Sequence, residues 1–236
     1  MEYKNKLKKL LLLPLFLGLA ALIAAAAVTA AEKWQESRVD TDALFFSALE
    51  EMNSWSSYRY NLKAHIHLHN GKTAETALNG ECDSSGNLHV YGKMMDTEME
   101  AYQFGNDHYR LNRQTKQWIH LTESPLLDNG VLKMVLEPVK NFAFSDTISV
   151  DCEGLEKEGK TKYYRYTAVP KEGFHVADTY FTDFTYKIDI DAKTKRIAGG
   201  IIHAVSRTES KNALTLTISF YDVNEAFTLT PPENSN

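Results

Sequence analysis

Tyr58–His69, YRYNLKAHIHLH, alternates between apolar and polar side chains over its whole length. Its even-numbered positions are aromatic or aliphatic, whereas its odd-numbered positions carry charged, amide or imidazole groups. Successive side chains of a strand point to opposite faces, so this pattern predicts one half-buried strand. The same alternation returns in short runs through most of the later chain. This favours one antiparallel sheet with a single covered face.

Turn residues divide the later chain into further strands. Asn70-Gly71 is a hairpin signal, and Gly199-Gly200 inside a later run indicates a bulge or a strong bend. Sequential hairpins are the simplest route through an antiparallel sheet. The predicted strands cover residues 58–69, 73–82, 88–92, 95–104, 109–111, 118–121, 148–154, 162–169, 180–190, 196–206 and 213–221.

Two segments have helical spacing instead. Asp40, Thr41 or Asp42 can cap a helix, which we expect to run from about Thr41 to Asn53. Its apolar stripe consists of Phe45, Ala48, Leu49 and Met52. A second helix is predicted within residues 124–144 and is limited by Pro138. Its apolar face consists of Leu132, Val135, Leu136 and Val139.

Residues 1–31 have the composition of an export signal. Four lysines precede an uncharged apolar run, residues 10–31, that ends in small side chains. The run is about long enough to span a bilayer. Cleavage near Ala30 would give a secreted protein, whereas an uncleaved segment would be a membrane anchor with the lysines in the cytoplasm. The region has no cysteine, which excludes a bacterial lipoprotein anchor. Residues 32–40 read as a linker and residues 233–236 as a tail.

The chain beyond residue 31 is acidic. Four of the 26 basic and one of the 31 acidic residues lie in residues 1–31, so the remainder carries a net charge of about −8. Such a domain is poorly suited to nucleic acid or to an anionic membrane surface.

Cys82 and Cys152 are the two cysteines. Outside the cytoplasm they could form a disulfide, which would stabilise the fold by roughly 4 kcal/mol in the chain-entropy model. The alternative is two separate buried thiols. Both residues occupy apolar positions of their runs, which suits either arrangement.

Three histidines, His65, His67 and His69, share one face of the first strand. Imidazoles so placed could bind zinc, copper or nickel, with His89 as a further ligand. The same face carries charged side chains, and the side chains of a strand row point in parallel rather than toward one centre. A solvated polar face is therefore the favoured interpretation. No other pattern indicates a cofactor.

No recognised catalytic motif is present. The sequence has no G-x-S-x-G, no H-E-x-x-H, no phosphate-binding glycine loop and no dinucleotide fingerprint. Neither cysteine lies in a recognisable nucleophile context. We therefore predict a protein that is not an enzyme.

The order of the parts resembles the LolA/LppX-like superfamily over residues 41–232. The resemblance rests on a helix that ends in Trp55-Ser56-Ser57-Tyr58, the strand Tyr186–Asp191, and a closing Phe220–Glu225 followed by Pro231. It implies an α+β, mainly β domain. Its strongly curved antiparallel sheet has about eleven strands and forms a half-barrel. One N-terminal helix and a central helical segment cover the concave face.

Members of that superfamily carry lipids or lipoproteins in the hollow, or sense envelope stress. The resemblance thus implies a non-catalytic cell-envelope binding protein that holds a lipid or other apolar ligand between sheet and helices. The alternative is an interaction or stress-sensor module that binds an envelope protein. This chain lacks the lipidated cysteine of the lipoprotein branch, so the resemblance does not identify a specific cargo for it.

Candidate lining residues follow from this expectation. The aromatic candidates have two possible roles. They could pack in the core, which aromatic side chains dominate generally. Some could instead line the hollow and offer hydroxyls to a headgroup. Met94, Met95 and Met99 are further candidates for adaptable lining or core filling. The predicted lining residues are Tyr58, Tyr60, Leu62, Ile66, Leu132, Val135, Leu136, Tyr164, Tyr166, Phe184 and Tyr186.

Overall fold

The computed structural model describes residues 39–122, 134–143, 146–173 and 177–233. Residues 42–236 form one compact unit, distinct from residues 1–41. The expected export segment and Leu132 lie outside the described residues. Within those described ranges, no helix combines the length and apolar character needed to cross a membrane.

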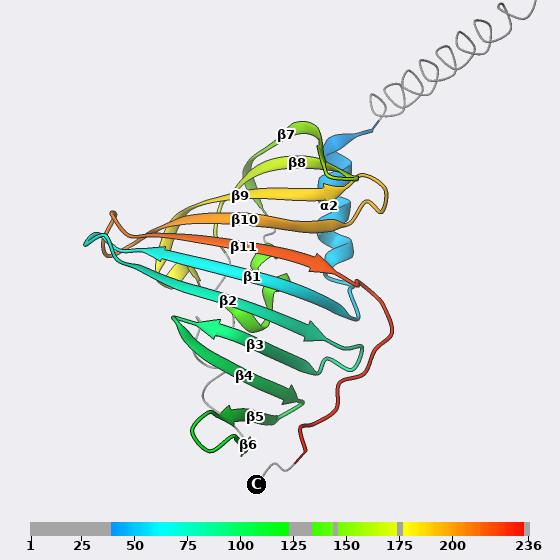
Figure 1. Ribbon diagram of the computed structural model, residues 1–236. Helices are drawn as coiled ribbons and strands as arrows, with labels where there is room; N and C mark the ends of the chain where they lie inside the picture. The colour runs from blue at the N-terminus through cyan, green and yellow to red at the C-terminus, as the bar shows by residue number, and fades with distance from the viewer. Residues whose placement is uncertain (1–38, 123–133, 144–145, 174–176, 234–236) are drawn as a thin grey trace, which may run out of the picture. The chain divides into compact units, whose positions relative to one another are not determined.

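Eleven antiparallel strands form one curved sheet, as predicted (Figure 1). Its order is β6-β5-β4-β3-β2-β1-β11-β10-β9-β8-β7. Neighbouring strands are mostly joined by hairpins, and the pairing of β1 with β11 unites the first six strands with the last five. The strands are β1 (Tyr58–His67), β2 (Thr73–Cys82), β3 (Leu88–Met94), β4 (Thr97–Phe104), β5 (Asp107–Asn112), β6 (Gln117–Thr122), β7 (Thr147–Glu158), β8 (Thr161–Pro170), β9 (Phe181–Asp191), β10 (Ile197–Ser206) and β11 (Ala213–Tyr221).

The alternation of β1 sets the two faces of the sheet. Tyr60 and Leu62 are buried on the concave face, here called the inner face. Asn61 and Lys63 are exposed on the convex face, here called the outer face. The period-two pattern therefore predicted both the strand and its orientation.

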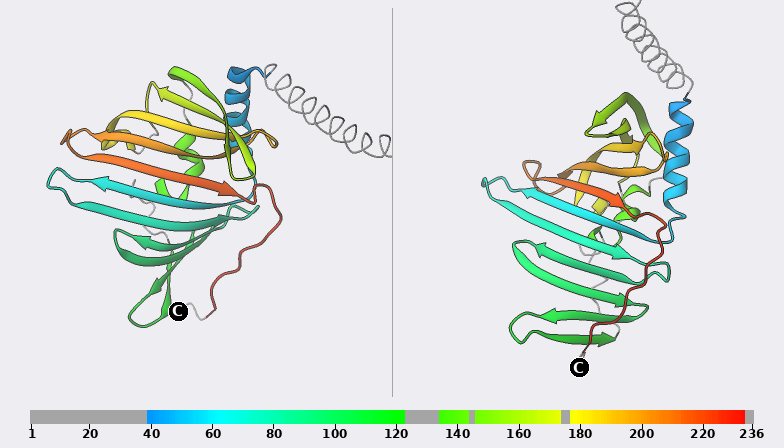
Figure 2. Two further views of the ribbon diagram at one scale, coloured as in Figure 1. Left: turned by 45° about the horizontal axis from the view of Figure 1, so that its top comes forward. Right: turned by 45° about the vertical axis from the view of Figure 1, so that its right-hand side comes forward.

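Helical elements lie over the inner face (Figure 2). Helix α2 (Thr41–Met52) buries Leu44, Phe45, Ala48 and Met52, close to the predicted stripe. The Phe45 ring packs 5.1 Å from that of Tyr166 on β8. Residues 134–136 are α-helical and the 3-10 helix η2 (Pro138–Phe142) follows, so the α-helical turn ends before Pro138 as expected. A second 3-10 helix, η3 (Ala177–Thr179), precedes β9.

A register shift at Ile197/Gly199 confirms the predicted irregularity in β10. At Gly200, an added Cβ would lie 2.6 Å from the Lys187 carbonyl oxygen and 3.0 Å from the Phe142 ring. The missing side chain therefore lets η2 approach the sheet closely.

One prediction was wrong and one open alternative is settled. The strand expected from residue 95 begins at Thr97, because Met95 and Asp96 form a turn with φ of 48° and 63°. This two-residue hairpin lacks the Asn-Gly signature by which such turns are recognised. Of the two arrangements open to the cysteines, the structure has separate thiols: Cys82 and Cys152 are free on β2 and β7, with five strands between them. Burial raises the pKa of the Cys82 thiol to about 11.

Candidate functional site

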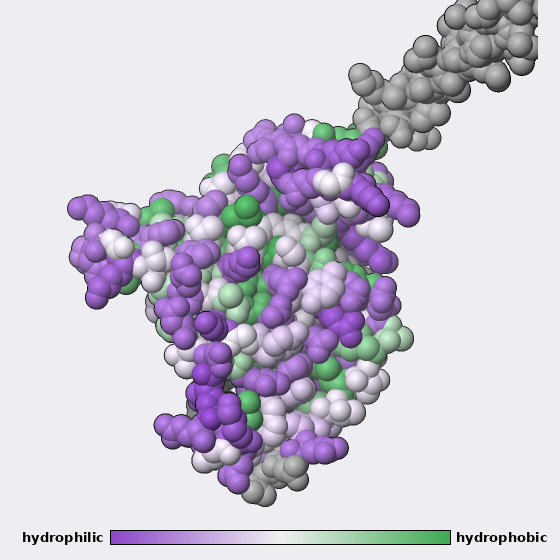
Figure 3. Space-filling view, viewed as in Figure 1, coloured by the Kyte–Doolittle hydropathy of each residue, from purple (hydrophilic) through white to green (hydrophobic). Residues whose placement is uncertain are grey.

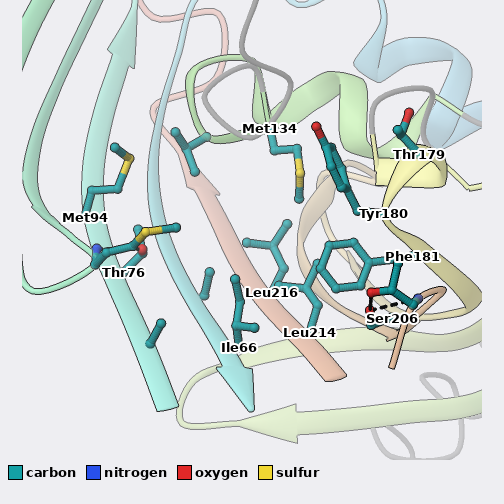
Figure 4. A pocket seen from close by; sticks show the side chains of 15 residues that line it. Ile66, Thr76, Met94, Met134, Thr179, Tyr180, Phe181, Ser206, Leu214 and Leu216 are labelled. Carbon is teal, nitrogen blue, oxygen red and sulfur yellow. Dashed lines mark hydrogen bonds between the residues drawn. The ribbon is translucent and has the colours of Figure 1, made fainter. Parts of the chain in front are cut away.

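An apolar pocket of about 280 Å³ opens on the inner face (Figure 4). Its walls come from the adjoining ends of β1, β2, β3, β9, β10 and β11, and Met134 and Val135 form part of its roof. The lining residues are Ala64, Ile66, Ala74, Thr76, Met94, Met95, Met134, Val135, Thr179, Tyr180, Phe181, Ser206, Thr208, Leu214 and Leu216.

Small side chains on neighbouring strands create the space. Ala64 on β1 lies opposite Thr76 on β2 and Leu216 on β11. Ile66 lies opposite Ala74 and Leu214 in the next inner row. Earlier on β1 the inner positions are held by tyrosine and leucine, whose larger side chains would occupy this volume.

Among the residues that the structure describes, those that line the pocket include no charged side chain. Three of its hydroxyls have partners: Thr76 Oγ1 accepts a hydrogen bond from Met95 N–H at 3.2 Å, and the hydroxyl oxygens of Ser206 and Thr208 lie 3.2 Å apart. Three methionines, Met94, Met95 and Met134, add flexible thioether side chains that adapt to irregular shapes. The pocket is suited to the uncharged, apolar part of a ligand.

Two buried tyrosines fix the roof. The Tyr60 hydroxyl donates to the Val135 carbonyl oxygen at 2.7 Å, and the Tyr186 hydroxyl donates to the Asn141 carbonyl oxygen at 3.1 Å. Asn141 Nδ2 in turn donates to the Met134 carbonyl oxygen at 2.8 Å. Burial raises the pKa of both tyrosines, which keeps them as neutral donors. These two hydroxyls hold the segment 134–142 on the sheet, which is the core-packing role that the sequence offered as one of two alternatives.

The predicted lining residues separate into two groups. Ile66 and Val135 line the pocket, as do Met94 and Met95. Leu62 and Leu136 are buried outside it, and Met99 lies beside a groove that includes outer-face side chains. Phe184 lines a separate polar depression with Asp183 and Arg207. The aromatic residues of the packed core are Tyr58, Tyr60, Tyr164, Tyr166 and Tyr186.

Sequence reasoning did not identify most of the pocket. The residues it missed are Ala64, Ala74, Thr76, Met134, Thr179, Tyr180, Phe181, Ser206, Thr208, Leu214 and Leu216. One usable signal was present: the inner-face residues of β1 decrease in size from Tyr60 to Ala64. A run of small residues on a covered face predicts either close packing or a cavity, and the structure has a cavity.

The histidine row does not converge on one point. The His65 and His67 rings are nearly parallel and 6.5 Å apart, and His69 follows the end of β1. His65 Nδ1 lies 3.5 Å from Glu75 Oε1. His89 lies elsewhere on the outer face, with its ring nitrogens 3.2 Å from Glu81 and Glu100. Over the described part of the chain, no group of three or more His, Cys, Asp or Glu residues is arranged to hold a metal ion.

Solved structures of the same architecture exist. LppX, a lipoprotein of Mycobacterium tuberculosis, aligns with 81% of this chain and 100% of its own at 10% identity and a TM-score of 0.56. LprF from Mycobacterium bovis (8% identity, 82% and 96% coverage) and a LolA superfamily protein from Nitrosomonas europaea (12%, 81% and 96%) give TM-scores of 0.48 and 0.38. No family model and no curated protein sequence matches the chain. The likeness to LppX shows that the chain has the LolA/LppX-like fold.

Proposed function

We propose that this chain is a non-catalytic, extracytoplasmic binding protein that holds one acyl chain, or a similar apolar group of a lipid, in the inner pocket. The uncharged lining of that pocket carries the proposal. Residues 1–31 would direct the domain out of the cytoplasm, either as a cleaved signal or as an anchor.

The driving force would be burial of apolar surface. Removing about 200 Å² of acyl surface from water contributes about 5 kcal/mol at about 25 cal/mol per Å². The roof is held by Tyr60 and Tyr186, so part of the site exists before a ligand enters. A preformed site avoids the entropy cost of ordering on binding. The likeness to LppX, a lipoprotein, supports a cell-envelope setting for the domain and says nothing of its ligand.

Native mass spectrometry with lipid extraction tests the proposal. Residues 32–236 would be exported from the cell, purified gently and analysed for retained lipid. A pocket-filling substitution, Ala64→Phe, should abolish retention while changing the free energy of unfolding by less than about 1 kcal/mol, because the added ring occupies existing space. Lys63→Phe is the matched control, since it adds the same ring to the outer face of the same strand.

Three possible results separate the candidate functions. Lipid retained by the wild type and by Lys63→Phe, but not by Ala64→Phe, supports the inner pocket as the site. A lipid-free wild type would instead favour an interaction module of the same fold that binds an envelope protein. Equal retention by all three would place the lipid outside this pocket.

A further inference from the structure

The distribution of side chains changes between the centre of the sheet and its β6 edge. On β1 the outer face carries polar residues and the inner face apolar ones. On β4 to β6 the large aromatic side chains stand on the outer face, and Gln103, His108 and Arg110 occupy inner positions. Together with the end of β3, this outer surface consists of His89, Tyr91, Tyr102, Phe104, Tyr109, Leu111, Trp118 and His120.

The rings of this aromatic surface touch in sequence. The Tyr102 ring stacks on that of His89, with centroids 4.0 Å apart and planes at 5°, and its edge meets Trp118 at 5.3 Å. The rings of Tyr109 and His120 stack at 4.8 Å. Aromatic side chains thus extend across four strands on the face turned away from the helices. Packing under the helices does not account for these rings, and apolar patches on an outer surface mark interaction sites.

Two amides continue the surface toward the centre of the sheet. Asn61 on β1 lies opposite Asn79 on β2, and Asn79 lies opposite Tyr91 on β3. Neither amide side chain is hydrogen-bonded to another group in the described part of the chain. Tyr91 is 39% exposed. Each amide offers both donors and an acceptor to a ligand that crosses the strands.

A groove of about 450 Å³ runs beside Tyr91 and Leu111. It is lined by three cationic side chains, Lys93, Arg113 and Lys116, and by two anionic ones, Glu98 and Glu100. Arg113 is paired with Glu98 at 3.0 Å, and Glu100 is in contact with His89 at 3.2 Å. Neither sign of charge dominates, so the groove does not select a strongly charged ligand.

We propose that the outer face of β1 to β6 binds an uncharged oligosaccharide. Tyr91 and Trp118 are three strands apart, so the apolar C–H faces of two different sugar rings would lie on them. Hydroxyls of the same chain of sugars would bond to Asn61, Asn79 and Glu100. An aromatic platform among amides and balanced ions suits a ligand that is polyhydroxylated but has apolar ring faces. Figure 3 views this outer face, where pale and green side chains interrupt a mostly hydrophilic surface. The site is on the opposite face of the sheet from the inner pocket.

Saturation-transfer difference NMR on the full chain tests this proposal. The protein would be held in micelles of a detergent without a sugar headgroup, with maltotriose and triacetylchitotriose as probes. We expect transfer to ring C–H protons of at least one probe and a tenfold or greater loss of affinity in Tyr91→Ala or Trp118→Ala. Phe46→Ala is the control, since Phe46 is an exposed aromatic residue on α2 that belongs to neither the inner pocket nor the outer aromatic surface.

Three outcomes would overturn the proposal. One is no transfer to either probe, and another is transfer that Tyr91→Ala and Trp118→Ala leave unchanged although both variants retain the native circular dichroism spectrum. The third is sedimentation showing a wild-type dimer that Tyr91→Ala converts to monomer, which would assign the aromatic surface to a contact between two copies of the chain.

Discussion

The inner face has a filled end and a hollow end, and the same strands build both. At the start of β1, Tyr58, Tyr60 and Leu62 are buried in a packed core. Two residues further on, Ala64 and Ile66 line a cavity. The alternation of the strand is identical at both ends. The comparison shows that side-chain volume, not polarity, decides where this sheet is structural and where it can accept a ligand.

The filled end is closed by aromatic contacts. The Trp55 ring, just after α2, meets Phe220 on β11 at 5.3 Å, and Phe220 meets Tyr58 at 6.0 Å. The hollow end has exposed apolar side chains at its rim instead: Met95 and Tyr180 are each 51% exposed. The packed core and the pocket therefore lie at opposite ends of the inner face.

Removing Tyr60 should produce the largest loss of stability. Tyr60→Ala deletes a fully buried ring that lies over Gly80, and it also removes the hydrogen bond to the Val135 carbonyl. We expect a loss of about 3–5 kcal/mol in the free energy of unfolding, measured with denaturant. Ile66→Ala on the same face of the same strand should cost about 1–2 kcal/mol, because Ile66 already borders a cavity. Equal losses would show that the two ends are packed alike.

Acid should weaken the filled end. Residues 222–233 run along the ends of the strands (Figure 1), and Leu229 N–H donates to Asp83 Oδ2 at 3.0 Å. Asp83 is 1% exposed. Burial acts to raise its pKa, but hydrogen bonds from Leu229, Asn87 and Ser85 outweigh it and lower the pKa. A lowered pKa in the folded state means that Asp83 stabilises the fold above the unfolded pKa of about 3.9 and ceases to do so as pH falls through the folded value.

Protonation of Asp83 should lower the free energy of unfolding by about 1–3 kcal/mol. Urea unfolding from pH 5 down to pH 2 measures this loss. Asp83→Asn should lower stability at neutral pH and flatten the acid dependence. Asp96→Asn is the control, because Asp96 is an exposed aspartate in the turn at the hollow end. An unchanged acid slope in Asp83→Asn would contradict the assignment.

The strands and α2 were predictable because their signals are local. Period two in Tyr58–His69 and the stripe of Thr41–Met52 each depend on residues close in sequence. The pairing of β1 with β11 joins residues about 150 positions apart, and neither the local pattern nor the resemblance specified it. The Met95-Asp96 turn was missed because its positive φ angles occur without the residues that favour them.

The site was harder to predict because apolar character does not distinguish lining from core. Tyr60 and Ile66 occupy the same inner face of β1, yet one supports the roof and the other lines the pocket. The role of each residue depends on how residues 134–142 cross above the sheet. That path is set by tertiary packing, so the local sequence of β1 does not reveal it. The outer aromatic surface was missed for a related reason. Near the sheet edge, Tyr102 and Tyr109 face outward, so aromatic residues there do not mark the core.

The smallest effect is expected at the turn of the hollow end. Met95 and Asp96 both adopt positive φ, and replacing them with Asn and Gly should remove strain and stabilise the fold by about 0.5–1 kcal/mol. The backbone contacts of this turn, including Met95 N–H to Thr76 Oγ1, can remain. Met95 also lines the pocket, so the double variant should unfold at higher denaturant but retain less lipid per protein. Met94→Leu, which keeps an apolar side chain in the pocket, should change neither quantity appreciably. A double variant that gained stability and kept all its lipid would mean that the Met95 side chain at the rim contributes nothing to binding, and the hollow end would then begin deeper, at Ala64 and Leu216.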